Sequence, residues 1–177
     1  MTTLIAHLSR PEPAEYDPYY ERYISLVKGD EIVTTLKTQT QDTRALLSPL
    51  SSQQAERRYA PGKWSVKEVL GHMNDTERIL SYRALRIGRG DKTPIEGFEQ
   101  DDYVPNGRFD RRTLEDLLDE FITIRAATVQ LFSHFDAAAA ERHGTANQKQ
   151  ISARALAYII AGHELHHRRI LEEKYLK

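Results

Sequence analysis

The chain has 177 residues, a length that favours a single domain and allows an apolar core without a disulfide or a structural metal. Its 25 basic and 26 acidic residues nearly cancel, which argues against a nucleic-acid-binding protein built on a broad basic face. It contains no cysteine, so disulfides, thiolate metal ligands and cysteine nucleophiles are excluded.

Two further expectations concern the compartment and the domain limits. No stretch approaches the ~18 apolar residues that a membrane-spanning helix needs, and the first residues do not follow a secretory signal pattern. We therefore expect no membrane partner and a cytoplasmic location. Residues 1–15 are interpreted as an N-terminal arm and residues 16–177 as one helical domain.

The first half of the chain predicts two helical regions joined by a connection. Residues 18–47 have helical periodicity with a thin apolar stripe, and Gly29 is placed to interrupt it. Residues 48–63 contain two prolines and a glycine and are typical of a connection.

The start of the next helix has the clearest signal in the sequence. Ser65 and Glu68 form an S-x-x-E capping box, and Trp64 and Val69 occupy the positions of a hydrophobic staple. An apolar face follows, and Gly88 is placed to end the helix.

Two more helices are predicted in the second half. Residues 88–112 form a long connection, and a loop of that length in a compact domain is usually functional or disordered. A helix follows Asp110, a polar connection spans residues 141–150, and the last helix covers residues 152–176. No segment shows the alternation of a strand. The sequence therefore predicts an all-α protein, a four-helix bundle with long connections.

Two histidines lie on the buried face of the last helix. His163 and His167 fall one turn apart in the middle of its apolar stripe. Each buried imidazole needs partners for its donor and its acceptor, and a shared metal ion would take one nitrogen from each ring. The alternative is that each ring forms a hydrogen bond to a neighbouring helix.

The same segment matches the H-E-x-x-H pattern of zinc proteases, an assignment that we reject. Only ten residues follow His167, too few for the distant third ligand, and Glu164 lies on the flank of the stripe. A third ligand must come from elsewhere. His72 lies at the margin of the apolar face of its helix, a position that by itself is more typical of a boundary histidine.

Three segments together carry a family resemblance. Residues 64–78 (WSVKEVLGHMNDTER) resemble the second-helix signature of the DinB-like (YfiT-like) superfamily, and residues 162–168 (GHELHHR) resemble its last-helix signature. The long connection, with FEQDDY at residues 98–103, is also similar to that of the family. The resemblance extends over roughly residues 18–175, and the two paired signatures at this separation are specific.

The resemblance implies a four-helix bundle with a three-histidine site for one divalent metal ion, nickel or zinc being commonest. Carried over residue by residue, the ligands are His72, His163 and His167. It further implies a small-molecule substrate and a metal-dependent enzyme, either a hydrolase or a thiol-dependent S-transferase that uses a low-molecular-weight thiol. A non-catalytic bundle that binds a small ligand or a metal is the alternative, and a structural bundle whose histidines satisfy one another is a third interpretation.

Other residues are weaker candidates. Arg125 lies within the apolar stripe of the third helix, where it would bind an anionic substrate or cofactor or serve as a structural arginine. Asp75 and Glu164 are either partners that orient the imidazoles or, as we favour, solvated carboxylates. Asp102 and Tyr103 are expected to border the pocket because of their place in the long connection.

Association of two chains is a further expectation. Several members of the resembled family form homodimers, and Tyr19, Tyr20 and Tyr23 form an aromatic set suited to a contact surface. The alternative is that these tyrosines pack against their own domain.

Overall fold

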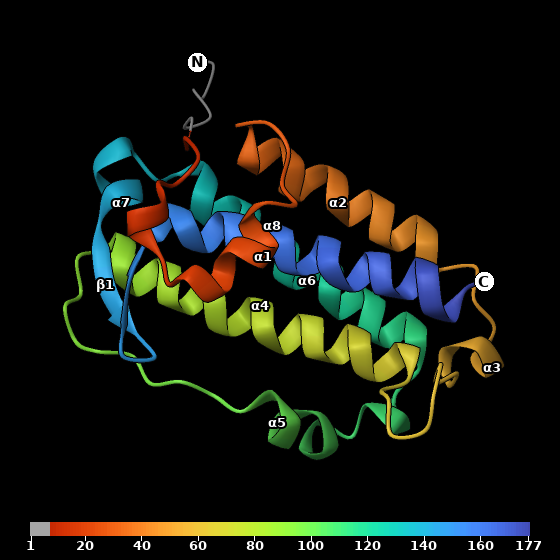
Figure 1. Cartoon of the computed structure of the whole chain (residues 1–177). Helices are drawn as coiled ribbons and strands as arrows, with labels where there is room; N and C mark the ends of the chain where they lie inside the picture. The colour runs from red at the N-terminus through yellow and green to blue at the C-terminus, as the bar shows by residue number, and fades with distance from the viewer. Residues whose placement is uncertain (1–7) are drawn as a thin grey trace.

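Four long helices form the framework of the protein. The computed structural model describes residues 8–177, and its long helices are α2 (Ile32–Leu47), α4 (Val66–Gly88), α6 (Leu114–Ser133) and α8 (Ala153–Ile170) (Figure 1). Helices α2 and α4 each pack against both α6 and α8, so that the order around the bundle is α2, α6, α4, α8. The predicted all-α four-helix bundle is confirmed.

The direction of the helices explains the long connection before α6. Helices α2 and α8 run towards the end of the bundle that carries α3 (Ser52–Ala55) and the C-terminus, whereas α4 and α6 start there and run back (Figure 1). Because α4 and α6 are parallel, residues 89–113 must return along the bundle. They contain α5 (Gln100–Gly107) and a 3-10 turn, Phe109–Arg111, which the sequence did not predict.

The N-terminal region covers one side of α8. Two 3-10 turns, Pro13–Glu15 and Pro18–Tyr20, lead into α1 (Glu21–Ile24), and the predicted break follows, with Gly29 at a φ of 76°. Of the predicted arm, residues 1–7 lie outside the described residues. Residues 8–15 pack against the bundle, where Leu8 is 2% exposed and Glu15 accepts a hydrogen bond of 2.8 Å from Arg154 Nε.

A hairpin between α6 and α8 corrects the expectation that the chain has no strands. After α7 (Ala137–Glu141), β1 (His143–Ala146) pairs antiparallel with β2 (Lys149–Ser152), and the two-residue turn between them has positive φ at both positions. This is a type I′ geometry, whose twist suits a hairpin. Strands of four residues are too short for alternation to identify them. Ile95 of the long connection forms a parallel bridge with Ala146 and so holds that connection against the hairpin.

The start of α4 follows the predicted capping box, whereas the start of α6 differs from the prediction. Ser65 and Glu68 form the reciprocal capping box at the start of α4, and Ser152 caps α8. Helix α6 is capped by Thr113 and starts three residues later than Asp110 suggested. Helix α8 ends in a π-helical turn, Leu171–Tyr175.

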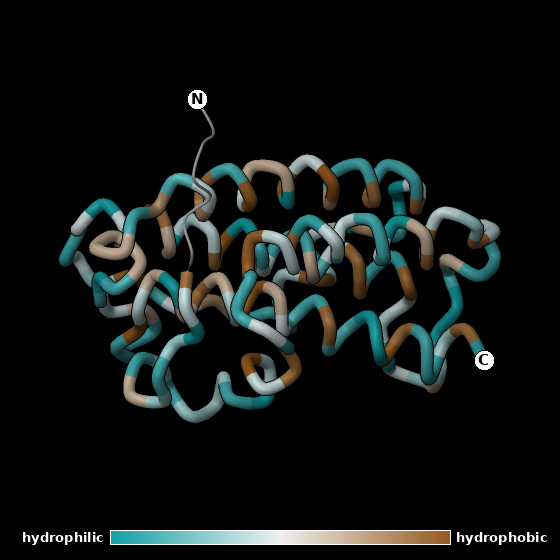
Figure 2. The backbone as a smooth tube through the Cα atoms, turned by 90° about the horizontal axis from the view of Figure 1, so that it is seen from above, coloured by the Kyte–Doolittle hydropathy of each residue, from teal (hydrophilic) through white to brown (hydrophobic). Residues whose placement is uncertain are grey.

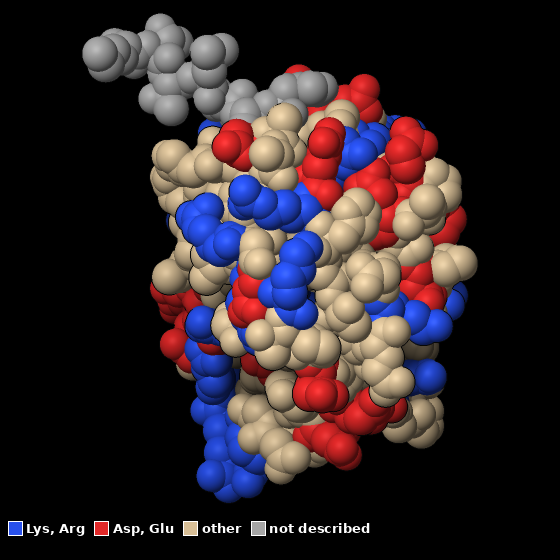
Figure 3. All heavy atoms as spheres, turned by 90° about the vertical axis from the view of Figure 1, so that its left-hand side faces the viewer, with Lys and Arg blue, Asp and Glu red and all other residues tan. Residues whose placement is uncertain are grey.

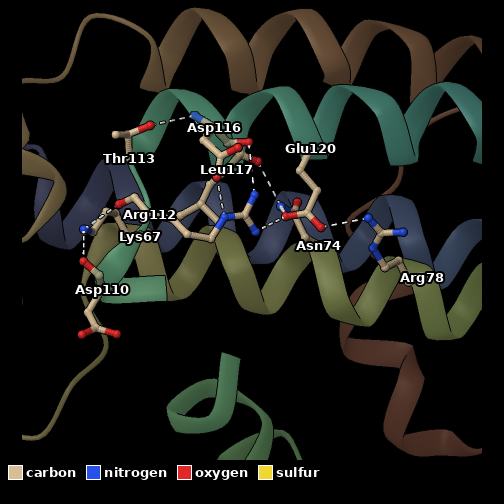
Figure 4. A network of polar contacts seen from close by, with 9 residues as sticks. All are labelled: Lys67, Asn74, Arg78, Asp110, Arg112, Thr113, Asp116, Leu117 and Glu120. Carbon is tan, nitrogen blue, oxygen red and sulfur yellow. Dashed lines mark hydrogen bonds and ion pairs between the residues drawn. The ribbon is translucent and has the colours of Figure 1, made fainter. Parts of the chain in front are cut away.

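Polar contacts hold the end of the long connection on α4. Lys67 Nζ donates to the carbonyl oxygens of Asp110 and Arg112 at 2.8 and 2.9 Å. Figure 4 shows that Arg112 also reaches Glu120 of α6, whose carboxylate accepts from Arg78 of α4 at 2.8 Å. These contacts fix the starts of α4 and α6 side by side.

The core has two apolar clusters with a polar layer between them. Apolar positions recur along each helix between hydrophilic ones (Figure 2), and they form one cluster around Leu36, Leu80, Phe132 and Ile159 and another around Leu47, Leu70, Phe121 and Leu171. Between the clusters every long helix contributes buried polar side chains, namely Gln39, Thr43, Glu77, Arg125, His163 and Glu164. A buried polar layer requires partners for each of its groups.

The face in Figure 3 carries basic and acidic side chains interspersed with uncharged ones. Among residues 8–177, no helix is both long and apolar enough to cross a bilayer.

Candidate metal centre

The structure brings the three predicted ligands together. His72 comes from α4, and His163 and His167 from α8, which pack against each other. The Nε2 atom of His163 lies 3.1 Å from His72 Nε2 and 3.1 Å from His167 Nε2. One ligand atom from each ring lies within 4.8 Å of both others. His72 and His163 are buried, at 3% and 7% exposed, and His167 is partly buried.

Burial keeps these rings neutral. Loss of hydration lowers the pKa of His72 to about 4 and lowers the pKa of His163 and of His167 well below 6.5, and the neighbouring imidazoles contribute to each shift. Neutral imidazole is the form that binds a metal, since a protonated ring nitrogen has no free lone pair.

Mutual hydrogen bonding does not satisfy all three rings. A neutral Nε2 carries either one proton or one lone pair, so the Nε2 atom of His163 can form only one good hydrogen bond with its two neighbours. A tetrahedral zinc site with Zn–N bonds of about 2.0–2.1 Å places its nitrogens about 3.3 Å apart. The two separations of 3.1 Å are close to this value. The donor set therefore fits a divalent ion better than it fits a purely hydrogen-bonded core.

Aromatic rings enclose the cluster from two sides. Trp64, just before α4, lies 4.9 Å from the His72 ring, and Tyr23 of α1 lies 5.4 Å from both His163 and His166. A side chain at Gly162 would place its Cβ 2.1 Å from the backbone oxygen of Tyr23, so glycine is what lets α1 approach α8 here. The sequence pointed to Tyr23 only as part of a dimer surface.

Glu164 and Asp75, the two carboxylates considered as partners of the imidazoles, interact with other groups. Glu164 is 2% exposed and accepts a hydrogen bond from Thr43, so the expectation of a solvated carboxylate is wrong for it. Burial raises its pKa. Asp75 is half-buried, and burial and the nearby Glu120 raise its pKa. The polar atom near His72 Nδ1 is Thr76 Oγ1, at 3.5 Å.

Arg125 lies in the polar layer and not at a ligand pocket. It is 1% exposed, and its Nε and one Nη donate to both oxygens of Glu77 at 2.8–3.0 Å. The other Nη donates at 3.2 Å to Gln39 and to the carbonyl of Leu36. The structure thus gives Arg125 an internal ion-pair role, and its predicted role in binding a cofactor is not supported by a contact with the pocket.

A pocket of about 430 Å³ opens beside the cluster, and His72 and His163 form part of its wall. The long connection contributes residues 97–101 to this wall, whereas Asp102 and Tyr103 lie next to the lining residues and not among them. Tyr19, Tyr20 and Tyr23 line the pocket as well, and Tyr19 is 51% exposed. Two of the three tyrosines considered for a dimer surface are therefore partly buried in their own domain.

The neutral histidines predict how the stability of the metal-free protein depends on pH. An unfolded chain protonates its imidazoles near pH 6.5, whereas folded His72 takes up its proton only near pH 4. Because the unfolded state then binds more protons, the free energy of unfolding falls as the pH decreases through this window. The slope approaches about 1.4 kcal/mol per pH unit for each ring that stays neutral, as the unfolded ring becomes fully protonated towards pH 5.

Urea denaturation of the chelated protein between pH 5 and 6.5 measures this slope. The variant His163→Ala should show a slope smaller by about one ring's contribution. Equal slopes for the two proteins would contradict the assignment of His163 as neutral.

The chain belongs to the DinB superfamily, since the model of that superfamily matches residues 35–171, more than three quarters of the chain. A comparison with curated protein sequences found no match.

Two solved structures have a similar fold. One is YfiT from Bacillus subtilis, described as a probable metal-dependent hydrolase with an unusual four-helix bundle topology. It has a TM-score of 0.76 and 13% identity and covers 97% of this chain and 95% of its own. The other is a mycothiol-dependent maleylpyruvate isomerase, with a TM-score of 0.66, 13% identity and coverage of 82% of this chain and 61% of its own. At this identity both likenesses show the fold alone.

Proposed function

We propose that this protein is a metal-dependent enzyme that acts on a small organic molecule, with His72, His163 and His167 as the ligands of one divalent ion, zinc or nickel. The observation that carries the proposal is the convergence of three neutral imidazole nitrogens beside a 430 Å³ pocket. Three neutral imidazoles beside an open pocket do not stabilise a helical bundle as well as apolar side chains would, so this arrangement favours a functional role over a structural one.

The arrangement of the ligands explains what the site offers. Three uncharged ligands leave a divalent ion its full charge and an open position, which lowers the pKa of bound water or thiol and polarises a carbonyl group. His72 and His163 both line the pocket, so a substrate in it would meet this position. Trp64 packs against His72 and Tyr23 against His163, and these contacts hold the two rings in place.

Hydrolysis is the reaction that we place first. The likeness to the probable metal-dependent hydrolase YfiT extends over nearly the whole chain. A thiol-dependent S-transfer is the second candidate, favoured by the likeness to the mycothiol-dependent isomerase and by the ability of the same site to lower the pKa of a thiol. In that case a low-molecular-weight thiol would be the cofactor.

A substrate screen with controlled metal content tests the proposal. Ester, amide and electrophilic substrates are offered with and without a thiol to protein that is zinc-loaded, nickel-loaded, chelated or reloaded. We expect activity that disappears on chelation and returns on reloading, while circular dichroism keeps its helical signal and the melting temperature falls. The two apolar clusters should hold the fold without the ion, whose contribution is the linkage term of about 3–4 kcal/mol at 100–1,000 times Kd.

The other interpretations give different results in the same screen. Cooperative unfolding on chelation at room temperature would show a structural metal. Stable metal binding without turnover of any substrate class would favour the non-catalytic binder. Activity unaffected by chelation would contradict the proposal.

A further inference from the structure

A buried cation, Arg83, lines the pocket at a distance from the histidines. Arg83 is on α4, and His72, Thr76, Leu80 and Arg83 line the pocket along one face of that helix. Arg83 is eleven positions after His72 in the same helix, which at about 1.5 Å per residue places their Cα atoms roughly 16 Å apart. The pocket is therefore elongated along α4, with the imidazoles at one end and a guanidinium at the other.

Arg83 is buried without a counter-ion. It is 3% exposed, and one Nη donates to the carbonyl oxygen of Glu96 at 2.8 Å. Its Nε has no hydrogen-bond partner, and no described carboxylate forms an ion pair with it. Arg125, which is similarly buried in the polar layer between the two apolar clusters, forms hydrogen bonds with both carboxylate oxygens of Glu77. Arg83 instead lines the pocket, and its polar neighbours, the Glu96 carbonyl and the Tyr20 hydroxyl, carry no negative charge.

A buried charge without a partner is costly, and an anion in the cavity removes the cost. Burial lowers the pKa of Arg83, a shift that an anionic neighbour would reverse. The guanidinium fork matches a carboxylate best, because two parallel N–H donors meet two oxygens.

The rest of the wall limits the charge and shape of the ligand. Leu80, Ile159 and Phe98 give the middle of the pocket an apolar surface, and the Phe98 ring centroid lies 5.9 Å from Arg83 Cζ. Asp17, Glu99 and Asp101 also belong to the lining and disfavour a ligand with several negative charges. Lys149 lines the pocket too, but its side chain is 64% exposed and lies 3.4 Å from Asp17.

We propose that Arg83 binds the carboxylate of an elongated, singly charged substrate whose apolar middle lies along α4 and whose reacting group reaches His72 and His163. The first half of this proposal, that Arg83 binds a carboxylate, depends only on the surroundings of Arg83. The second half, that the other end of the substrate reacts at His72 and His163, rests on the proposed function. Arg83 is on this account a specificity residue of the pocket.

Calorimetric titration of the metal-free protein tests the carboxylate half, because no ion is then present to attract the anion. The probes are octanoate, octanamide and octyl phosphate. A charge-assisted hydrogen bond to Arg83 should make octanoate bind about tenfold or more tightly than octanamide. The preference should disappear in Arg83→Gln and persist in part in Arg83→Lys, which keeps a cation.

Two control variants identify the cation. Arg86→Gln removes an arginine one turn away on α4 that pairs with Asp91 outside the pocket, and Lys149→Gln removes the exposed cation of the lining. Both should keep the preference. Equal binding of octanoate and octanamide, no binding of octanoate, a preference that survives Arg83→Gln or one that depends on Lys149 would overturn the proposal. Tighter binding of octyl phosphate would overturn the assignment of a single charge.

A second titration separates the two halves. In the zinc-loaded protein, 8-mercaptooctanoate should bind more tightly than octanoate, and His163→Ala should abolish this gain without changing the preference for carboxylate over amide. If 8-mercaptooctanoate binds no more tightly than octanoate while the Arg83-dependent preference for carboxylate is present, the proposed metal site is wrong and the proposed carboxylate site is supported.

Discussion

The variant Arg125→Met is expected to lower the free energy of unfolding by about 3–5 kcal/mol, which is the usual cost of breaking a buried ion pair by removing one partner. Arg125 and Glu77 are 1% and 4% exposed, and the variant leaves the Glu77 carboxylate buried with no cation beside it. The carbonyl of Leu36 and the amide of Gln39 lose a donor as well. Urea denaturation at pH 7 measures the change.

Two controls show whether the cost comes from the orphaned charge. The double variant Arg125→Met/Glu77→Leu removes both charges and should recover most of the loss, since an apolar pair of similar volume can replace a buried ion pair. Arg83→Met removes a similarly buried arginine that has no carboxylate partner, and because it leaves no buried charge behind it should not lower the free energy of unfolding by a comparable amount. A loss of similar size in Arg83→Met and Arg125→Met would contradict this account of the two arginines.

The second large effect concerns metal affinity. Replacing His163 with alanine should weaken zinc binding by more than about 100-fold, because loss of a partner that only orients a ligand already costs about 10–100-fold. His163 is the ring whose Nε2 lies 3.1 Å from both others, so its removal leaves two donors of the three. Titration against a competing chelator measures the affinity.

His166 provides the matched control on the same helix. It is half-buried, its ring packs on Tyr23 and His167, and it is not part of the converging group. His166→Ala should change zinc affinity by no more than a few-fold. Equal losses in the two variants would mean that the ion is held elsewhere.

The fold could be predicted because its helices are specified by patterns among residues that are close together in the sequence. The capping box at Ser65 and Glu68 determines the start of α4 through contacts three residues apart. The apolar stripe of α8 likewise placed His163 and His167 on a buried face. The third ligand, His72, followed from the family resemblance, because its position on its own helix does not reveal which helix packs opposite.

The features that could not be predicted from the sequence depend on contacts between segments that are far apart along the chain. Glu164 is on the flank of its helix and would be solvated in isolation, but Thr43 of α2 lies against it and excludes water. Arg83 has no periodic signal that separates it from a surface arginine, because the segments that enclose it, residues 97–101, the hairpin and Tyr20, are distant in the sequence or come from loops. Two strands of four residues give no alternation to detect.

The most direct test of the metal centre is a crystal structure of protein purified without an affinity tag or chelator, with anomalous diffraction recorded at the zinc and nickel absorption edges. The account predicts one strong anomalous peak per chain, about 2.0–2.1 Å from ring nitrogens of His72, His163 and His167 for zinc, with a further position open to the pocket. No peak between these rings after soaking with either ion, or a peak held by other residues, would contradict it.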